Sequence, residues 1–455
     1  MKIDSLVFEI GSTTTVVNAF NQMHTEKPTF IGQGQAPTSV NLGDVTIGLS
    51  QAIDNLKQNL EVDEIDASEV FATSSAAGGL KMTVHGLVYD MTVKAAKEAA
   101  LGAGANIKQI TAGKLGSFQL KNIENLKPNI ILIAGGVDYG ERETALYNAE
   151  KIAEMKLNIP VIYAGNCENQ DQVKEIFDSC EQGEYLNIVD NVYPKIDCLN
   201  VEPTRKVIQD VFEKHIIHAP GMEKVRTIVN KHIIPTPGSV MTAAQLLEQE
   251  IGDLIVFDVG GATTDLHSVT SGSEKVSKIL IHPEPKAKRT VEGDLGVYVN
   301  YLNIIEMITK EQLCRDLGLK EEELNELIVK YEAIPSIAQI PLVERLTLEA
   351  LVKALDRHVG QYRHLYGTKG RTQVAEGKDL TNIKYVIGTG GALTRLPNRI
   401  KMLGDLLAMQ DQTKLAPRKD CQILIDNHYI MASLGVLSLE YPLQAYSLLK
   451  QSLGI

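Results

Sequence analysis

Three glycine-rich turns, each preceded by an apolar run, constrain the fold of this chain more than any other feature. The first is Gly-Ser-Thr-Thr at 11–14, between the apolar runs 3–10 and 15–20, and it predicts a β-hairpin. The second, Gly-Gly-Ala-Thr-Thr at 260–264, lies between residues 253–259 and 266–271 in the same manner. The third, Gly-Thr-Gly-Gly at 388–391, follows a predicted strand and precedes a helix start. The repeated order of strand, glycine turn, hydroxyl residues and second strand predicts two related lobes.

The residue types in these turns are suited to a nucleotide. Glycine lets a ligand approach the backbone, and neighbouring hydroxyl and N–H groups suit phosphate oxygens. The candidate phosphate-binding residues are Gly11, Ser12, Thr13, Thr14, Gly260, Gly261, Ala262, Thr263 and Thr264. Backbone without side chains can also pack against an adenine–ribose face, so the candidate adenosine-binding residues are Gly388, Thr389, Gly390 and Gly391.

Two carboxylates stand directly before the first two turns. Glu9 precedes the first turn, and Asp258 ends the strand before the second. Mg²⁺ prefers oxygen ligands and keeps most of its hydration shell, so a carboxylate beside a phosphate cradle usually holds it through water. We therefore expect Glu9 and Asp258 to hold Mg²⁺ indirectly and to act catalytically by orienting the attacking water.

The remaining pattern predicts an α/β protein with two lobes. Residues 1–234 are expected to form an N-terminal lobe with a core at about 1–75 and an additional α/β region at about 76–234. Strands and helices alternate in that region, beginning with a helix predicted at 83–101, and such alternation indicates a mostly parallel sheet. Residues 235–455 are expected to form a C-terminal lobe with a charged helical subdomain at about 300–365.

Composition excludes several other classes of protein. A net charge of −12 and a pI near 5.4 argue against a nucleic-acid or anionic-membrane binder, because both need a basic face. The apolar runs fall far short of the ~20 residues that span a bilayer, and the first residues lack the pattern of a secretory signal. The five cysteines form no C-x-x-C pair, as is typical of reduced thiols. We expect a cytoplasmic protein.

The turns and their order resemble the superfamily of actin, the sugar kinases and the heat-shock chaperone ATPases. Its two phosphate motifs and its adenosine motif correspond to FEIGSTTT at 8–15, FDVGGATTDL at 257–266 and VIGTGGALT at 386–394. The resemblance implies a two-lobed actin-like, ribonuclease H-like α/β fold with an inserted α/β subdomain, a small helical subdomain, and ATP–Mg²⁺ between the lobes. It also places interlobe helices at 235–247 and 428–438, where small residues such as Ala432 and Gly435 allow close crossing. Glu9 departs from the superfamily, which usually has Asp at that place.

The whole chain is similar to the MutL-type accessory proteins of adenosylcobalamin-dependent glutamate (methylaspartate) mutase, which are unrelated to mismatch repair. The matching segments are EIGSTTTVVNAF at the start, SSAAGGLKM at 74–82, IAGGVDYGERETALYNA at 133–149, RTVEGDLG at 289–296 and FDVGGATTDLHSV. This resemblance implies a reactivating chaperone that uses ATP and Mg²⁺, with the mutase as its client protein. A slow ATPase that drives a conformational switch would suit that role.

Some alternatives stay open. Gly135, Gly136, Asp138 and Glu141 either contact a ligand or the client, or form an ordinary strand-to-helix loop. Arg289, Glu292 and Asp294 either relay the nucleotide state or bind the client, or are solvated loop charges. The rival functions are a small-molecule kinase and a nucleotide-dependent scaffold on the same fold. The sequence does not indicate an oligomeric state.

Overall fold

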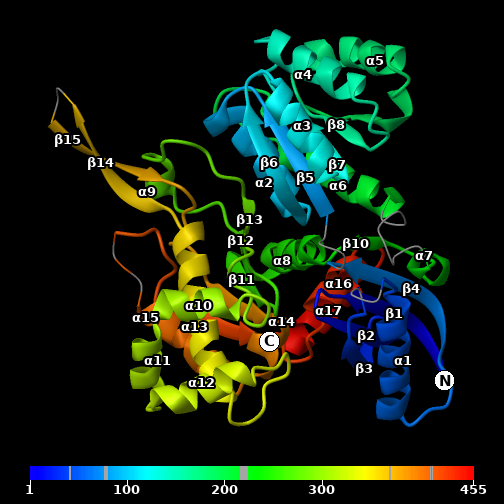
Figure 1. Ribbon diagram of the computed structural model, residues 1–455, viewed down its shortest axis with the longest axis vertical. Helices are drawn as coiled ribbons and strands as arrows, with labels where there is room; N and C mark the ends of the chain where they lie inside the picture. The colour runs from blue at the N-terminus through cyan, green and yellow to red at the C-terminus, as the bar shows by residue number, and fades with distance from the viewer. Residues whose placement is uncertain (40–42, 76–79, 216–223, 368–369, 410, 412) are drawn as a thin grey trace.

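The computed structural model describes residues 1–455 except 40–42, 76–79, 216–223, 368–369, 410 and 412. Two lobes lie side by side, and an α/β subdomain inserted into the first lobe stands above them (Figure 1). The expected two-lobed α/β architecture with an inserted α/β subdomain is therefore present.

The first lobe is built on a five-stranded sheet in the order β10-β4-β1-β2-β3. Strands β1 to β3 pair antiparallel, and β4 and β10 continue the sheet in parallel. Helix α1 covers the sheet at β2 and β3. The elements are β1 (Lys2–Ile10), β2 (Thr14–Asn21), β3 (Thr29–Pro37), α1 (Thr46–Leu60), β4 (Asp66–Ser74) and β10 (Ile233–Pro235).

The second lobe repeats this topology. Its sheet has the order β13-β12-β11-β16-β17, again with three antiparallel strands followed by two parallel ones. The strands are β11 (Leu254–Val259), β12 (Thr264–Val269), β13 (Ala287–Glu292), β16 (Tyr385–Thr389) and β17 (Gln422–Ile425). The prediction of two related lobes is confirmed, and the first two glycine turns occupy the same place in each: the hairpin between strands one and two.

Two helices cross between the lobes, α8 (Thr236–Ile251) and α16 (Met431–Leu437), and α17 (Pro442–Leu453) packs beside them. The Ser239 hydroxyl donates a hydrogen bond to the Ala432 carbonyl at 2.5 Å. A Cβ placed on Gly435 would overlap the Ser239 carbonyl oxygen, so only glycine permits this crossing distance. An apolar cluster surrounds the crossing, and it contains side chains from both sheets, among them Phe71 and Val256. The expected close crossing is thus present.

The inserted subdomain contains a wholly parallel five-stranded sheet in the order β6-β5-β7-β8-β9. Its amino-terminal edge faces the lobes, because the Ala105 carbonyl at the start of β6 accepts a hydrogen bond from Arg289 of β13. The strands are β5 (Leu80–Gly86), β6 (Ala105–Ala112), β7 (Ile130–Ile133), β8 (Val161–Tyr163) and β9 (Leu186–Ile188); the helices are α2 (Lys94–Gly102), α3 (Ser117–Leu126), α4 (Glu143–Glu154), α5 (Gln170–Ser179) and α6 (Val201–His215). The short helix α7 (Val225–Ile228) lies beside β4 of the first lobe (Figure 1).

The helix predicted at 83–101 is wrong over its first part. Residues 80–86 form β5, which lies between β6 and β7, and a π-helical turn (Tyr89–Val93) precedes α2. The run Leu-Lys-Met-Thr-Val-His-Gly is buried at nearly every position, so it lacks the alternation that distinguishes a half-exposed strand.

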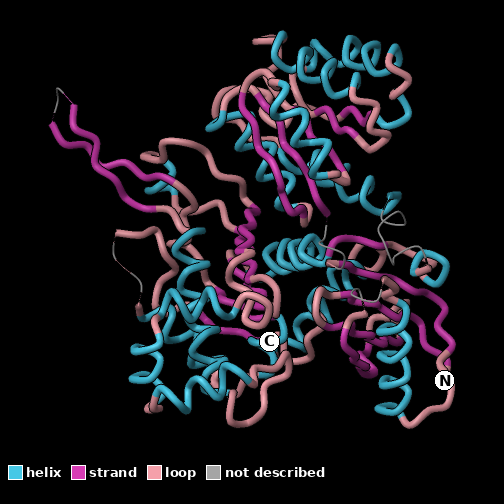
Figure 2. The backbone as a smooth tube through the Cα atoms, viewed as in Figure 1, coloured by secondary structure: helices cyan, strands magenta, loops and turns pink. Residues whose placement is uncertain are grey.

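The second lobe also holds a group of helices and a projecting hairpin. The helices are α10 (Tyr301–Ile308), α11 (Lys310–Leu317), α12 (Glu321–Val329) and α13 (Ile340–His358), with α9 (Glu274–Ser277), α14 (Gly390–Arg395) and α15 (Arg399–Ala408) elsewhere in the lobe. The helical character predicted to residue 365 ends at His358, because β14 (Gln361–Gly367) and β15 (Gly370–Glu376) form an antiparallel ribbon that extends away from the body (Figure 2). Of the helices in the ranges given above, none has the length and apolar character needed to cross a membrane.

Candidate nucleotide site

The first two glycine turns have the same backbone geometry. The Gly11 N–H donates to the Thr14 carbonyl, and the Gly260 N–H donates to the Thr263 carbonyl, both at 3.0 Å. The turns also meet across the two lobes, since a Cβ placed on Gly261 would lie 3.1 Å from Cγ2 of Thr13. The structure therefore brings together two segments that the sequence predicted to bind the same phosphate chain.

The backbone of the second turn is oriented by the loop 297–300. The carbonyls of Gly260 and Gly261 accept hydrogen bonds from the backbone N–H groups of residues 297–299, and the Ala262 carbonyl accepts one from the Asn300 side chain at 3.0 Å. In a trans peptide the N–H points opposite to the carbonyl of the same unit. The N–H groups of residues 261–263 therefore point away from that loop as a consecutive set, which is the arrangement that binds anions.

The hydroxyl groups of the turns have different surroundings. Those of Thr13 and Thr14 lie 3.3 Å from each other at the half-buried tip of the first turn, and Ser12 donates to the Ser75 carbonyl at 3.2 Å. The Thr263 hydroxyl donates to Asp265 Oδ2 at 3.0 Å. The buried hydroxyl of Thr264 donates to the Leu295 carbonyl at 2.8 Å, so it is held within the second lobe.

Glu9 and Asp258 lie near the ends of β1 and β11, the strands that lead into the two turns. Burial, together with the nearby charge of Asp258, raises the pKa of Glu9 to about 8. Burial and the charge of Asp265 raise the pKa of Asp258 to about 7, against the opposing effect of Arg289. Burial and nearby negative charge disfavour the ionised form of both carboxyl groups, and a bound divalent cation would offset this effect.

The free oxygen of Glu9 fits such a cation. Glu9 Oε1 accepts a hydrogen bond from the Tyr429 hydroxyl at 3.1 Å, whereas the buried Oε2 has no hydrogen-bond partner among the described residues. A buried carboxylate oxygen without a hydrogen-bond partner destabilises the fold unless a ligand binds to it. Within the same part of the chain, no group of three or more His, Cys, Asp or Glu residues is arranged to hold a metal ion directly.

The third turn adjoins Asp258. Gly390 has φ +81°, and a Cβ there would lie 2.5 Å from Oδ1 of Asp258 and 2.6 Å from the backbone of Val259, so this position requires glycine. Gly391 faces open space, since a Cβ there would meet no atom within 4 Å. Gly388 instead packs against Leu393 and other buried side chains of the lobe. Of the four predicted adenosine residues, Gly391 is thus the one with free space beside it.

Two further residues belong to the site but are not among those predicted from the sequence. Asp426, at the end of β17, accepts hydrogen bonds from the Thr389 hydroxyl at 2.9 Å and from the backbone N–H groups that begin α16. An Asp shortly before a helix is a recognisable capping signal. Tyr429 reaches Glu9 from a left-handed backbone with φ +53°, and no local pattern of residues indicates that contact.

Arg289 connects the second phosphate turn to the inserted subdomain. Its Nε and Nη2 donate to Asp265 Oδ1 at 3.0 and 2.7 Å, while Nη1 donates to the carbonyls of Leu101 and Ala105 at 3.0 and 3.2 Å. Because Thr263 donates to the other oxygen of Asp265, three contacts lead from the turn to the end of α2. The side chains of Arg289 and Asp265 are almost fully buried.

Glu292 and Asp294 lie on a different path. Both accept hydrogen bonds from Arg357 of α13, at 2.6 Å for Glu292 and 2.7 Å for Asp294. These two residues therefore tie the end of β13 to the helical group, whereas Arg289 ties β13 to the inserted subdomain. The three charges predicted as one relay are divided between two contacts.

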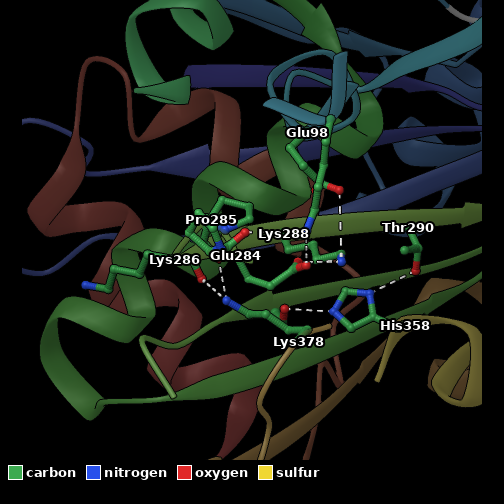
Figure 3. Close-up of polar contacts among 12 residues, drawn as sticks. Glu98, Glu284, Pro285, Lys286, Lys288, Thr290, His358 and Lys378 are labelled. Atoms are coloured by element: carbon green, nitrogen blue, oxygen red, sulfur yellow. Dashed lines mark hydrogen bonds and ion pairs between the residues drawn. The ribbon is translucent and has the colours of Figure 1, made fainter. Parts of the chain in front are cut away.

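A buried cluster of charges joins α2 to β13 and to the residues just before β13 (Figure 3). Glu284 pairs with Lys94 and with Lys288 at 2.6 Å each, and Lys288 lies 3.9 Å from Glu98. Burial works against the charged form of Glu284, yet the two lysines lower its pKa. Removing one partner of such a buried set leaves an uncompensated charge, which makes this contact specific for one arrangement of subdomain and lobe.

The segment 135–144 lies away from the nucleotide turns. It follows β7 at the carboxyl edge of the inserted sheet, the edge opposite to the one that faces the lobes. Asp138 Oδ1 accepts hydrogen bonds from the Cys167 N–H at 3.0 Å and from the Asn191 side chain at 2.9 Å. Glu141 caps α4 through the N–H and hydroxyl of Thr144.

Comparison with known proteins assigns the family. The profile of the MutL protein family matches residues 5–453. The chain belongs to the MutL protein family. A relative in this family, Protein MutL of Clostridium tetanomorphum, is 36% identical over 464 residues, which cover 98% of each chain.

Two solved structures align along nearly the whole length of this MutL-family chain. A diol dehydratase-reactivating factor in its nucleotide-free form is 12% identical with a TM-score of 0.39, covering 97% of this chain and 100% of the other. A glycerol dehydratase reactivase is 12% identical with a TM-score of 0.38, covering 95% of this chain and 99% of the other.

Proposed function

We propose that this MutL-family protein is an ATP-dependent reactivating chaperone that releases damaged cobalamin from adenosylcobalamin-dependent glutamate (methylaspartate) mutase in the cytoplasm. The observation that carries the proposal is the meeting of two glycine turns with the same backbone hydrogen bond beside the carboxyl groups of Glu9 and Asp258, with Arg289 leading from the second turn to a separate subdomain. The choice of client rests on the family resemblance of the segments named above.

In this proposal the turns hold the phosphate chain of ATP. The consecutive N–H groups of residues 261–263 bind phosphate oxygens from the second lobe, and Thr13 and Thr14 do so from the first. Gly391 leaves room for the adenosine. Mg²⁺, held by Glu9 and Asp258 together with water, supplies charge neutralisation for the phosphates.

The rate of hydrolysis then depends mainly on how the attacking water is positioned against the γ-phosphate. Asp258 and Glu9 orient the attacking water, and Tyr429 fixes Glu9 by its hydrogen bond. Closure of the two lobes excludes other water from the turns. Such a site, with no dedicated strong base, is suited to the slow turnover of a switch.

The switch itself follows from differential contacts. The hydroxyl and N–H groups that bind the γ-phosphate have this partner in the ATP-bound state and lose it after hydrolysis. Such a difference in contacts between two nucleotide states is required for a population shift. Thr263 lies at the start of the path through Asp265 and Arg289 to Leu101 and Ala105. The proposed result is a nucleotide-dependent rotation of the inserted subdomain relative to the second lobe.

The first test measures ATP hydrolysis by Asp258→Asn. The proposal predicts a fall of about 100-fold or more, because the carboxylate orients water and cation. Asp420→Asn is the matched control, since Asp420 is exposed and pairs with the exposed Arg418. Unchanged ATP turnover in Asp258→Asn would contradict the catalytic role of Asp258.

The second test addresses the client. The protein and ATP–Mg²⁺ are mixed with glutamate mutase blocked by cyanocobalamin, and activity is measured after fresh adenosylcobalamin is added. Recovery that needs ATP supports the reactivating function, and no recovery with an intact client contradicts it. Phosphoryl transfer to a metabolite would favour the kinase instead, and nucleotide-dependent light scattering would favour the scaffold.

A further inference from the structure

The carboxyl edge of the inserted sheet displays large apolar side chains to solvent. Each lies in a segment that follows one of the parallel strands: β5, β6, β7 or β9. The exposed fractions are 44% for Val88, 57% for Tyr89, 75% for Phe118, 81% for Tyr139 and 70% for Ile196. A soluble surface rarely gathers such side chains at one place without a binding role. We call these five residues the apolar edge.

The segments that carry the apolar edge are joined in two pairs. The Gly113 N–H after β6 donates to the Gly86 carbonyl at the end of β5 at 2.8 Å. The Asp138 N–H after β7 donates to the Pro194 carbonyl in the loop after β9 at 3.0 Å. Tyr139 and Ile196 therefore project from two loops that are fixed side by side.

Tyr139 is held outward at an energetic cost. Its φ is +63°, a left-handed conformation that bulky residues rarely adopt. The backbone is kept there by Asn166, a fully buried residue that accepts from the Tyr139 N–H at 3.2 Å and donates to the carbonyls of Gly140 and Glu141. Strain that the surrounding structure maintains, at an exposed aromatic side chain, indicates a displayed group rather than a packing accident.

The apolar edge lies on the side of the subdomain away from the nucleotide. The amino edge of the same sheet is the one bound by Arg289 through Ala105, and the Arg205 side chain of α6 also donates to the Ala287 carbonyl of β13 at 3.0 Å. In Figure 1 the inserted subdomain extends above both lobes. A partner on the carboxyl edge would thus be moved by any rotation that originates at Arg289.

The charges around the apolar edge are mainly acidic. Lys114 and Glu143 pair at 3.8 Å, and Arg142 and Glu168 pair at 3.9 Å, so these four charges offset each other. The other charged side chains in the loops after β5, β7 and β9 are the half-buried Asp138 and the exposed Asp90, Glu141, Asp190, Lys195 and Asp197. An apolar centre with a rim of excess carboxylates complements an apolar patch bordered by lysine and arginine.

We propose that the apolar edge is the docking surface for the client enzyme, and that it binds an apolar patch on that protein bordered by basic residues. This inference rests on the proposed function, because it names the client as the occupant. The side chains project outward from the loops, whereas small molecules bind in concave sites, so a protein surface is the occupant that fits.

The test uses the full chain with three substitutions, Phe118→Gln, Tyr139→Asn and Ile196→Gln. Asn is chosen at 139 because it tolerates the left-handed backbone. The matched control is Val329→Gln, Ile334→Gln and Ile337→Gln, which removes side chains that are 84%, 67% and 89% exposed in the second lobe. Binding to immobilised glutamate mutase carrying hydroxocobalamin is measured by biolayer interferometry, and ATP hydrolysis is measured without the client.

The triple variant at the apolar edge is expected to bind the mutase at least about tenfold more weakly and to lose reactivation to the same degree, because exposed aromatic anchors dominate such interfaces. Its ATP hydrolysis without the client should equal that of the wild type, as should every property of the control. Asp190→Lys should weaken binding several-fold, with the effect shrinking at high salt.

Each other outcome overturns the inference in a distinguishable way. If the wild type binds and reactivates the mutase and the triple variant does so equally, the docking surface is elsewhere and the proposed function stands. If the wild type neither binds nor reactivates, the proposed function fails and the inference fails with it. If the wild type sediments as a dimer and the triple variant as a monomer, the occupant is a second copy of this chain and not the client.

Discussion

Arg289 and Asp265 form a buried ion pair in which Nε and Nη2 of the guanidinium both donate to Oδ1 of the carboxylate, at 3.0 and 2.7 Å. The same guanidinium binds two backbone carbonyls of the inserted subdomain through Nη1. One side chain therefore connects the strand after the second phosphate turn with a subdomain that is inserted more than a hundred residues earlier in the chain. Only arginine has enough donors in a fixed fork to do this.

Arg289→Met should lower the free energy of unfolding by about 3–5 kcal/mol, because it leaves the Asp265 carboxylate buried without its cation. Replacing both partners, as Arg289→Met with Asp265→Leu, should recover part of that loss. Urea unfolding measures both. Arg418→Met is the control, since its pair with Asp420 is about 70% exposed on both sides and should contribute at most about 1 kcal/mol. A double variant as unstable as the sum of the single variants would contradict this account.

Arg289→Lys tests whether Arg289 connects the second phosphate turn with the inserted subdomain, rather than how much it stabilises the fold. Lysine keeps the positive charge but cannot donate to Asp265 and to both carbonyls in the same geometry. We expect the variant to bind nucleotide with at most a few-fold loss of affinity. Hydrogen–deuterium exchange around residues 101–105 should respond to ATP in the wild type and should respond much less in the variant. An equal response in both proteins would show that Arg289 does not transmit the nucleotide state.

Much of the site could be predicted because its signals are local. A glycine turn between two apolar runs, with hydroxyl residues beside it, needs only a few consecutive residues to be recognised. The repeat of that unit then predicted two lobes, and the strand orders of the two sheets agree with it.

The contacts that depend on distant partners could not be predicted in this way. Tyr429 reaches Glu9 from the other lobe, and Arg289 reaches carbonyl groups, which carry no side-chain signature in the sequence. The helix predicted at 83–101 overlaps the second half of β5, because burial of this strand on both faces removes the period-2 pattern. Strand β10 has three residues, and its place beside β4 is set only when the chain returns from the inserted subdomain.

Gly435→Ala should destabilise the protein, because the added Cβ overlaps the Ser239 carbonyl where α8 and α16 cross. Overpacking of this kind costs about 1–3 kcal/mol. Gly404→Ala in α15 is the matched control, since a Cβ there has its nearest neighbour at 3.9 Å and alanine favours the helix by about 0.5–1 kcal/mol. Thermal unfolding should therefore shift in opposite directions. A Gly435→Ala protein as stable as the wild type would mean that the lobes separate more easily than the crossing implies.

Gly391→Leu tests the adenosine side of the candidate site. A Cβ at Gly391 has open space, so the substitution should leave the unfolding free energy within about 0.5 kcal/mol of the wild type. If adenosine occupies that space, the leucine side chain should weaken ATP binding by about tenfold or more, as measured by titration calorimetry. Gly113→Leu is an unsuitable control, because its φ of +85° strains any side chain, whereas Gly293→Leu has comparable open space without a left-handed backbone. Equal ATP affinity in Gly391→Leu and Gly293→Leu would show that adenosine does not bind beside Gly391.

His232 gives a pH dependence with a defined sign. Its Nδ1 lies 3.1 Å from Glu213 of α6, and its Nε2 lies 3.3 Å from Glu440, while Lys231 and Arg226 also approach these carboxylates. The hydrogen bond to Glu213 raises the pKa of His232 against the opposing effect of burial. A pKa that is higher in the folded protein stabilises the fold fully below the ordinary value of about 6.5, and the stabilisation is lost as pH rises through the folded pKa.

His232→Gln should therefore lower the unfolding free energy by about 0.5 kcal/mol at pH 5.5, a value reduced for the partial exposure of the site, and by nearly nothing at pH 9. Urea unfolding at several pH values measures the difference. In a Glu213→Gln background the same substitution should show a weaker dependence on pH, because the main cause of the raised pKa has been removed. If the difference in unfolding free energy between His232→Gln and the wild type stayed constant from pH 5.5 to 9, or grew with pH, protonated His232 would not stabilise the fold through Glu213 and Glu440.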